Sequence, residues 1–490
     1  MGSPRDLLVS FCAALALSCG AAGQPHAPPS RVTATSSSPE AVALFHEFEI
    51  LSGNFRDAEG QEKLARAIAL DPSFWLAHAW HGMATPTPEG LAEVQRAVAM
   101  SVRLPIAERL TIQRALAYRL GAIETCRKLA RRIAELAPDD VQAQIGHGLD
   151  ELVNHHYAPA AEAYRRATLL DPGSGAAFAG LATALAAGGA HGDALDAARR
   201  YLSIAPDEPN AYDTLGEIQL AAGQIEEASA SFAKAFQMQP TFWVAMQGLA
   251  VARLHALDFR GARLAAEKAR ATVHGLDEKM KLGILLAYAA LMEGSPEEAV
   301  AIAARLEREA VALGDPFWTA WAPMPSAGVL LETGHYAEAL LAVERARSQQ
   351  GALARHSDER GFAWLGLGIK VRALARLGRD AEAREAAQQI EAEARKTPGS
   401  VALRDLRQLS RGLIATLSGD LPGARDAFSA CTVEAAQCRW ELYAVQRRLG
   451  DHAGAEATRR EITSNHGRDA VSAWAAFRAA REGGRLAPPL

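Results

Sequence analysis

The histidines are the residues of this sequence whose type and spacing come nearest to a metal site. His78 and His81 stand three positions apart, which would place both imidazoles on one face of a helix. His155 and His156 are adjacent, and His147 precedes them by about two helical turns. A protein zinc site takes three or four ligands, and no third ligand is placed beside either group. We therefore predict no metal and no cofactor.

The motifs of the common catalytic sites are absent from the sequence. There is no phosphate-binding Gly-x-x-x-x-Gly-Lys-Ser/Thr loop, no His-Glu-x-x-His, no Cys-x-x-Cys pair and no Gly-x-Ser-x-Gly elbow. No pair of carboxylates can be placed as the acid and the base of a glycosidase. We therefore predict that the chain is not an enzyme.

Two of the five cysteines, Cys431 and Cys438, leave two interpretations open. In an exported protein they could form a disulfide between the end of one helix and the start of the next. They could equally be two small apolar residues at helix contacts, because the sequence does not supply the Cβ geometry that decides between the two. Cys126 is expected to be a small buried residue.

The elements that carry these residues follow a repeat of 33 or 34 residues. Prolines recur in register at positions 72, 105, 138, 172, 206 and 240. Proline lacks the N–H that a helix interior needs and clashes with the preceding turn, so each of these prolines ends a helix. The chain is rich in Ala, Leu, Glu and Arg and has only 6% aromatic residues, which favours helices over strands.

The period from Asn210 to Pro240 shows how one unit is built. Its first helix carries a Leu-Gly pair, a glycine makes the turn, and small and aromatic residues line one face of the second helix. These residues are Leu215, Gly216, Gly223, Ala228, Phe232 and Ala235. The pattern resembles the tetratricopeptide repeat, a helix–turn–helix unit of about 34 residues. The resemblance implies an all-α fold, a right-handed α-α superhelix.

A glycine followed five residues later by alanine marks the turns of the C-terminal half, at Gly294, Gly334, Gly378, Gly419 and Gly450. We predict a tetratricopeptide-like solenoid of about twelve helix pairs, with longer helices in this half. A C-terminal capping helix would carry Val471, Trp474 and Phe477 on its inner face. The predicted segments are a signal peptide (1–19), a disordered tether (20–38), two arrays (39–240 and 241–465), a capping helix (466–482) and a disordered tail (483–490).

The first twenty residues have the character of a secretion signal. The apolar stretch from Leu7 to Leu17 is too short to span a bilayer. The run Ala16-Leu17-Ser18-Cys19 resembles the lipobox of bacterial lipoproteins, which implies that Cys19 becomes the first mature residue and carries a lipid. The expected location is the bacterial cell envelope. The protein would be exported and lipid-anchored on the periplasmic side or at the outer membrane, with no other membrane contact.

Pairs of aromatic residues begin three of the predicted helices, just after a proline. They are Phe74-Trp75, Phe242-Trp243 and Phe317-Trp318. We interpret them as plugs of the joints between successive repeats. The alternative is an exposed aromatic row that holds a peptide or a sugar.

The tetratricopeptide resemblance also implies a ligand groove, lined by the second, fifth, ninth and twelfth residues of each unit. Transferred by register, the groove residues are Ile112, Leu116, Arg119, Gln142, Ile145, Leu149, Leu152, Asn210, Asp213, Glu217, Val244, Gln247, Val251 and Leu254. The set is mainly apolar, with two acidic residues close together at Asp213 and Glu217. Such a lining suits an extended or helical peptide with apolar anchors. The alternative is that tight coiling of the superhelix buries these residues.

The charge balance favours a protein partner over a nucleic acid. The chain has 52 basic and 57 acidic residues, whereas a nucleic-acid binder normally shows a basic excess on one face. We predict a non-catalytic interaction scaffold of the bacterial cell envelope that binds a peptide or protein partner in its groove. The alternatives are a regulatory solenoid that senses a ligand or peptide and, less favoured, a glycan-binding or glycan-active protein.

Overall fold

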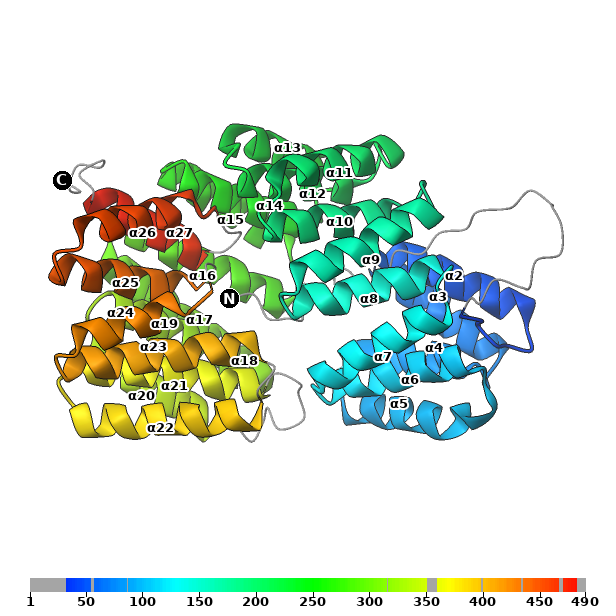
Figure 1. The fold of residues 1–490 in the computed structure, drawn as a ribbon. Helices are drawn as coiled ribbons and strands as arrows, with labels where there is room; N and C mark the ends of the chain where they lie inside the picture. The colour runs from blue at the N-terminus through cyan, green and yellow to red at the C-terminus, as the bar shows by residue number, and fades with distance from the viewer. Residues whose placement is uncertain are drawn as a thin grey trace. The chain divides into compact units, whose positions relative to one another are not determined.

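The structure, a computed structural model, describes residues 32–53, 57–85, 87–314, 316–349, 359–397, 400–432, 435–466 and 470–482. Every regular element among them is a helix (Figure 1), which confirms the predicted all-α helical-repeat fold. Within these ranges, no helix combines the length and apolar character needed to cross a bilayer. The predicted signal peptide with Cys19, the tether up to residue 31 and the tail from residue 483 lie outside the described residues.

The chain divides into two compact units between Ile218 and Gln219. The N-terminal unit contains α2 (Pro39–Gly53), α3 (Asp57–Leu70), α4 (Trp75–Ala84), α5 (Pro88–Met100), the 3₁₀ helix η1 (Ser101–Arg103), α6 (Ile106–Arg119), α7 (Ile123–Leu136), α8 (Val141–Val153), α9 (Tyr157–Leu170), α10 (Gly175–Ala187), α11 (His191–Ile204) and most of α12 (Pro209–Ala221).

The C-terminal unit begins within α12. It contains α13 (Ile225–Met238), α14 (Trp243–His255), α15 (Phe259–Thr272), α16 (Leu276–Glu293), α17 (Pro296–Leu313), α18 (Pro316–Trp321), α19 (Pro323–Glu332), α20 (Tyr336–Ser348), α21 (Glu359–Arg376), α22 (Asp380–Lys396), α23 (Val401–Leu417), α24 (Leu421–Ser429), α25 (Ala436–Arg448), α26 (His452–Ser464) and α27 (Ala470–Glu482).

The helices follow one another as pairs from α2/α3 to α25/α26. The short helices α18 and α19 together take the place of one first helix, because Pro323 opens α19 and interrupts the run. Counted in this way, the described part of the chain contains twelve pairs. The helices lengthen at α16 rather than at residue 241, since α14 and α15 have 13 and 14 residues and α16 and α17 have 18 each.

An aromatic ring seated on helix glycines joins successive repeats. Tyr164 of α9 is fully buried, and its ring lies against Gly148 of α8 and Gly180 of α10. A Cβ at Gly180 would come within 2.2 Å of this ring, so the two helices can approach the tyrosine only where a side chain is missing. The same seating recurs between successive pairs at Phe232 of α13 and Gly248 of α14, and within one pair at Phe428 of α24 and Gly412 of α23.

The Phe-Trp pairs also contribute to packing. Phe74, Phe242 and Trp318 are buried. The ring of Phe74 lies 5.2 Å from that of Phe45 in α2, within the usual distance of a packed aromatic pair. The contact of Phe74 with the preceding pair agrees with packing at a joint between repeats, whereas for Phe242 and Trp318 this role stays a prediction.

In the C-terminal unit, α27 does more than cover the last pair. It packs against α25 and α26 and also against α14 and α16, so the red end of the chain lies beside green helices in Figure 1. Phe477 of α27 is buried, with its ring 5.6 Å from that of Phe259 at the start of α15. The last helix of this unit is thus held by its first helices.

Candidate functional site

A cleft opens between α4 and α6, the first helices of two successive pairs in the N-terminal unit. Apolar and aromatic side chains form most of its wall, and one ion pair adds charge. Its lining consists of Leu76, Ala79, Trp80, Met83, Thr111, Arg114, Ala115, Tyr118, Cys126 and Asp150. Positions 76, 80 and 83 share one face of α4, and positions 111, 115 and 118 share one face of α6, because both sets follow the helical period.

Arg114 and Asp150 form the polar part of the cleft. Nε of Arg114 donates to Oδ2 of Asp150 at 2.5 Å, and Nη2 lies 3.5 Å from the carbonyl oxygen of Gly146. The two charged side chains are only 18% and 8% exposed. A guanidinium held beside an apolar wall suits a ligand with an apolar side chain next to a hydrogen-bond acceptor.

A buried carboxylate, Glu151 of α8, binds the helices behind the cleft together. Burial alone would raise its pKa, but the donors around it outweigh this effect and lower the pKa below the usual range. They are Nδ1 of His156 at 2.7 Å, Nη2 of Arg131 at 3.1 Å and Nη1 of Arg127 at 3.4 Å. Nε2 of His147 lies 3.4 Å from the same carboxylate. Three of the five histidines considered for metal binding thus have other contacts. His147 and His156 lie beside Glu151, and Nδ1 of His155 lies 2.7 Å from the hydroxyl of Tyr157.

The remaining two histidines share one carboxylate. Nδ1 of His78 lies 2.6 Å from one oxygen of Glu93 in α5, and Nδ1 of His81 lies 2.7 Å from the other. Burial raises the pKa of Glu93, but the two imidazoles more than offset it and lower the pKa. Across the described ranges, no three His, Cys, Asp or Glu side chains are arranged to hold a metal ion.

Residues 32–38, here called the strap, lie along the N-terminal ends of first helices. Val32 donates its N–H to Oδ2 of Asp140, the N-cap residue of α8, at 2.9 Å. Thr35 donates its N–H and its hydroxyl to the two oxygens of Glu108 in α6, at 2.9 and 2.6 Å. Burial raises the pKa of Glu108 more than these two hydrogen bonds lower it.

The C-terminal part of the strap contacts Asp71, which lies just before α4. Oδ2 of Asp71 accepts the hydroxyl of Ser36 at 2.6 Å and the N–H of Ser37 at 2.7 Å. The predicted disordered tether therefore does not extend over residues 32–38. The reason is physical: three carboxylates far along the chain satisfy its N–H and hydroxyl groups, and the composition of the segment does not reveal them.

The structure separates the predicted groove residues into two sets. Six are partly exposed and keep a groove role as a prediction: Leu116, Arg119, Gln142, Glu217, Val244 and Gln247. Eight are buried and face neighbouring helices: Ile112, Ile145, Leu149, Leu152, Asn210, Asp213, Val251 and Leu254. The cleft shares α6 and α8 with the predicted groove but uses other positions on them, and its remaining wall is mainly α4, which carries no predicted groove residue. The spacing of Leu76, Trp80 and Met83 is the sequence signal that marks this wall.

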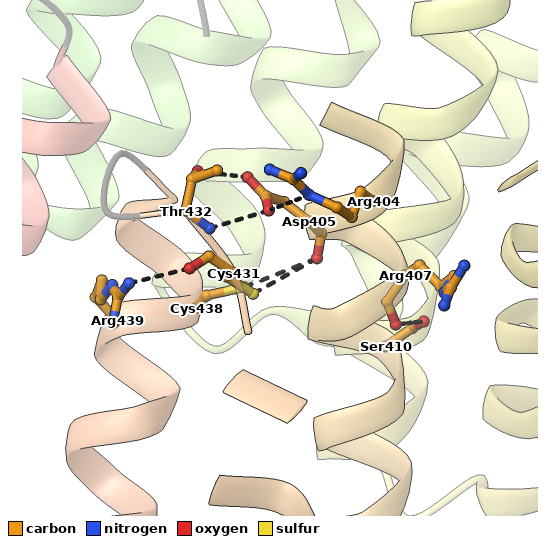
Figure 2. Close-up of a disulfide and its surroundings, with 8 residues drawn as sticks. All are labelled: Arg404, Asp405, Arg407, Ser410, Cys431, Thr432, Cys438 and Arg439. Atoms are coloured by element: carbon orange, nitrogen blue, oxygen red, sulfur yellow. Dashed lines mark hydrogen bonds and ion pairs between the residues drawn. A yellow bond between two sulfur atoms is a disulfide. The ribbon is translucent and has the colours of Figure 1, made fainter. Parts of the chain in front are cut away.

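Cys431 and Cys438 are joined by a disulfide in the structure, which is one of the two interpretations left open by the sequence (Figure 2). It connects the end of α24 to the start of α25. Asp405 of α23 holds the same turn, because its carboxylate accepts the N–H of Thr432 at 3.0 Å and the hydroxyl at 2.6 Å. Cys126 is buried, as expected, with its Sγ 3.8 Å from the carbonyl oxygen of Arg114.

Comparison with known proteins gives one local sequence match. No family model matches the chain. Over 97 residues it is 33% identical to the small glutamine-rich tetratricopeptide repeat-containing protein 2 of Mycosarcoma maydis, a match that covers 20% of this chain and 28% of that protein. The chain thus spans little more than a quarter of the length of this relative.

Several solved structures show a similar arrangement of helices at low identity. YrrB, described as a tetratricopeptide-repeat protein with an unusual peptide-binding site, is 18% identical, with 38% of this chain and 93% of that chain covered and a TM-score of 0.28. A tetratricopeptide repeat protein from Parabacteroides merdae is 17% identical, with 51% and 98% covered and a TM-score of 0.37. The human IFIT1 dimer with PPP-AAAA is 14% identical, with 78% and 87% covered and a TM-score of 0.41.

At these TM-scores the fold assignment rests on the chain's own features. Its prolines and turn glycines recur with the predicted period, its helices form twelve pairs in the described ranges, and its aromatic rings sit on glycines between pairs. Together with the local match to a curated relative of this repeat type, these features show an all-α helical-repeat solenoid that resembles tetratricopeptide-repeat proteins.

Proposed function

We propose that this chain is a non-catalytic scaffold that binds a peptide or protein partner on the first helices of its N-terminal unit. The observation that carries the proposal is the cleft between α4 and α6. Trp80 and Tyr118 supply aromatic anchoring area, and Arg114 supplies a charged donor at the wall. Aromatic and arginine side chains around an apolar recess are the residues that dominate binding energy at protein interfaces.

The proposed location is the bacterial cell envelope, with export directed by the N-terminal signal and a lipid on Cys19. The Cys431–Cys438 disulfide supports this location, because disulfides persist in oxidising compartments and are rare in the cytosol. Mass spectrometry of the mature N-terminus tests it. A diacylated or triacylated Cys19 is expected, and an intact Met1 would contradict the proposal.

The binding function is tested with the full mature chain and detergent-solubilised membranes of the source cells. We expect quantitative pull-down to enrich at least one envelope protein with the wild-type chain. The double variant Trp80→Ala/Tyr118→Ala should lose this protein while retaining its helical circular dichroism. The matched control is Leu169→Ala, because Leu169 is 77% exposed on α9 and does not line the cleft.

The outcomes separate the alternatives. A partner that is lost only with the cleft variant supports the proposal. A partner retained by all three proteins would place binding elsewhere on the chain. The absence of any enriched protein would count against a scaffold function.

A further inference from the structure

The inner face of the C-terminal unit already holds a helix. Here the inner face means the surface made by the first helices α14, α16, α19, α21, α23 and α25. The helix α27 packs against α14, α16 and α25 of this set as well as against α26, which precedes it in the chain. A helix that only ended the array would contact α25 and α26, so its contacts with α14 and α16 are the additional ones.

A buried acid marks the place where α27 is bound. The side chain of Glu332, the last residue of α19, is 6% exposed. Its Oε2 accepts the indole N–H of Trp474 at 3.0 Å and Nη1 of Arg478 at 2.9 Å. Its Oε1 accepts Nη2 of Arg372 in α21 at 2.8 Å. Among the described residues, Oε1 is thus bonded by Arg372 of the inner face and Oε2 by Trp474 and Arg478 of α27.

An aromatic ring and small apolar side chains surround this polar centre. The guanidinium of Arg478 lies 4.0 Å from the ring centroid of Trp440 in α25, a cation–π distance. Ala475 and Ala479 of α27 are buried against the same part of α25 and α26, where small side chains let the helices approach. The binding surface therefore combines the Glu332 carboxylate, the Trp440 ring and an apolar area that accepts a helix face of small side chains.

The residues of α27 that make these contacts have a regular spacing in the sequence. Trp474 and Arg478 are four positions apart and so lie on one side of the helix, where both reach the same oxygen of Glu332. Ala475 and Ala479 repeat the spacing one position later. The inner face therefore recognises a helix by three features. They are an indole N–H, an arginine four positions later, and an alanine directly after each of these two residues.

We propose that the inner face of the C-terminal unit is a helix-binding site, that α27 is its resident ligand, and that a partner helix with an indole and an arginine four positions apart can take its place. This goes beyond the scaffold function proposed for the N-terminal cleft, because it uses a different unit and different residues. An acidic helix is excluded, since it would bring a like charge to Glu332 and leave Oε2 without donors.

The choice of a helix over an extended peptide rests on the spacing of the contacts. Trp474 Nε1 and Arg478 Nη1 converge on one atom, which requires side chains one turn apart on a helix. In an extended segment the same two residues would be separated by roughly 13 Å along the chain. The site therefore selects helical ligands by geometry as well as by charge.

The test adds the sequence of α27 as a free peptide and measures its binding to a chain whose own α27 is weakened. The probe is a fluorescein-labelled peptide of residues 470–482, and the receptor is the full chain with Trp474→Ala and Arg478→Ala, which weaken the resident helix but leave Glu332 and Trp440 intact. Fluorescence anisotropy should show saturable binding to this variant. Binding to the wild-type chain should be at least roughly tenfold weaker, because the tethered helix competes at high effective concentration.

Two controls make the result specific. Adding Glu332→Ala to the receptor should abolish binding, and a peptide in which Trp474 is replaced by Ala and Arg478 by Glu should not bind. Equal binding of the control peptide, or no binding to a receptor with native circular dichroism, would overturn the proposal.

A second measurement applies if the double variant does not fold. With the wild-type chain, an excess of unlabelled peptide should speed hydrogen exchange in α27 by displacing it, while exchange in the N-terminal unit stays unchanged. Unchanged exchange in α27 at saturating peptide would show that the helix is a fixed structural element and not a replaceable ligand. The result is independent of the partner pull-down, so the failure of one proposal leaves the other standing.

Discussion

Thr35 donates two hydrogen bonds to Glu108, from its backbone N–H at 2.9 Å and from its hydroxyl at 2.6 Å, although 73 residues separate them. The carboxylate is buried. Through this pair and its neighbours, the strap is attached to elements of three different repeats.

Replacing Thr35 by valine removes the hydroxyl donor and keeps the shape of the side chain. We expect the strap to lose about 1.5 kcal/mol of binding free energy, or about tenfold in hydrogen-exchange protection at residues 32–38. Thr33→Val is the matched control, because Thr33 is exposed like Thr35 in the same segment but does not share its hydrogen bonds to Glu108. Equal protection in the two variants would show that the Thr35 hydroxyl does not hold the strap.

Glu151→Gln should destabilise the N-terminal unit by about 3 kcal/mol, because it leaves the charges of Arg127 and Arg131 beside a buried neutral group. Urea unfolding followed by circular dichroism measures this change. The control is Glu162→Gln, which breaks an exposed pair with Arg165 and should change stability by less than about 0.5 kcal/mol. A similar small effect at Glu151 would mean that the cluster is not a structural centre.

Gly180→Ala should destabilise the fold by about 1–3 kcal/mol, because the new methyl group would meet the ring of Tyr164 at 2.2 Å in a packed core. Gly192→Ala provides the opposite case, since nothing lies within 4 Å of a Cβ at this exposed helical position. That substitution should be neutral or stabilise the helix by up to about 1 kcal/mol. Thermal unfolding of the two variants compares them directly.

Reduction of the Cys431–Cys438 disulfide should lower the stability of the C-terminal unit by about 2 kcal/mol, since it frees a short turn in the unfolded chain. The melting temperature with and without dithiothreitol measures the effect. A Cys431→Ser/Cys438→Ser variant should melt as the reduced protein does and no longer respond to reductant. A response to reductant that persists in this variant would point to another thiol.

The docking of α27 should be lost in acid. Burial raises the pKa of Glu332, but the charges of Arg372 and Arg478 and the indole N–H of Trp474 outweigh it, so the pKa is lowered in the folded protein. A lowered carboxyl pKa gives stability that is fully present above the unfolded value of about 4.3 and is lost as pH falls through the folded value. The arginines that face Glu332 keep their charge throughout this range.

The ¹⁹F resonance of 5-fluorotryptophan at position 474 reports this transition as the pH is lowered from 7 through the folded pKa of Glu332. In Glu332→Gln the resonance should show no titration in this range, although docking will be weaker at neutral pH. A titration that persists in the variant would assign the change to another carboxyl group.

The parts of the fold that depend on neighbouring residues could be predicted from the sequence. The prolines, the turn glycines and the Gly–aromatic spacing predict the helix pairs, because each of them acts within about one repeat. The groove register is harder, since a shift of one position on a helix changes the facing direction by about 100°. Thr111 lines the cleft for this reason, whereas its neighbour Ile112 is buried.

The strap and the docking of α27 could not be predicted in this way. Val32 and Asp140 are 108 residues apart, and Glu332 and Trp474 are 142 residues apart. No local pattern pairs such residues, and the carboxylates involved look like ordinary surface acids in the sequence. The polar composition of residues 32–38 predicts disorder, and the prediction fails there because these residues find hydrogen-bond partners elsewhere in the chain.

The contact between Trp474 and Glu332 also has a mechanical consequence. In a linear array each repeat touches only its neighbours, so the array can fray from its last repeat and unfold one step at a time. Here the final helix is fastened to helices near the start of its own unit, and it cannot peel away without breaking contacts with α14, α16 and α19 together. A pull on the C-terminus would therefore load the whole unit at once, and the unit would yield in one cooperative event.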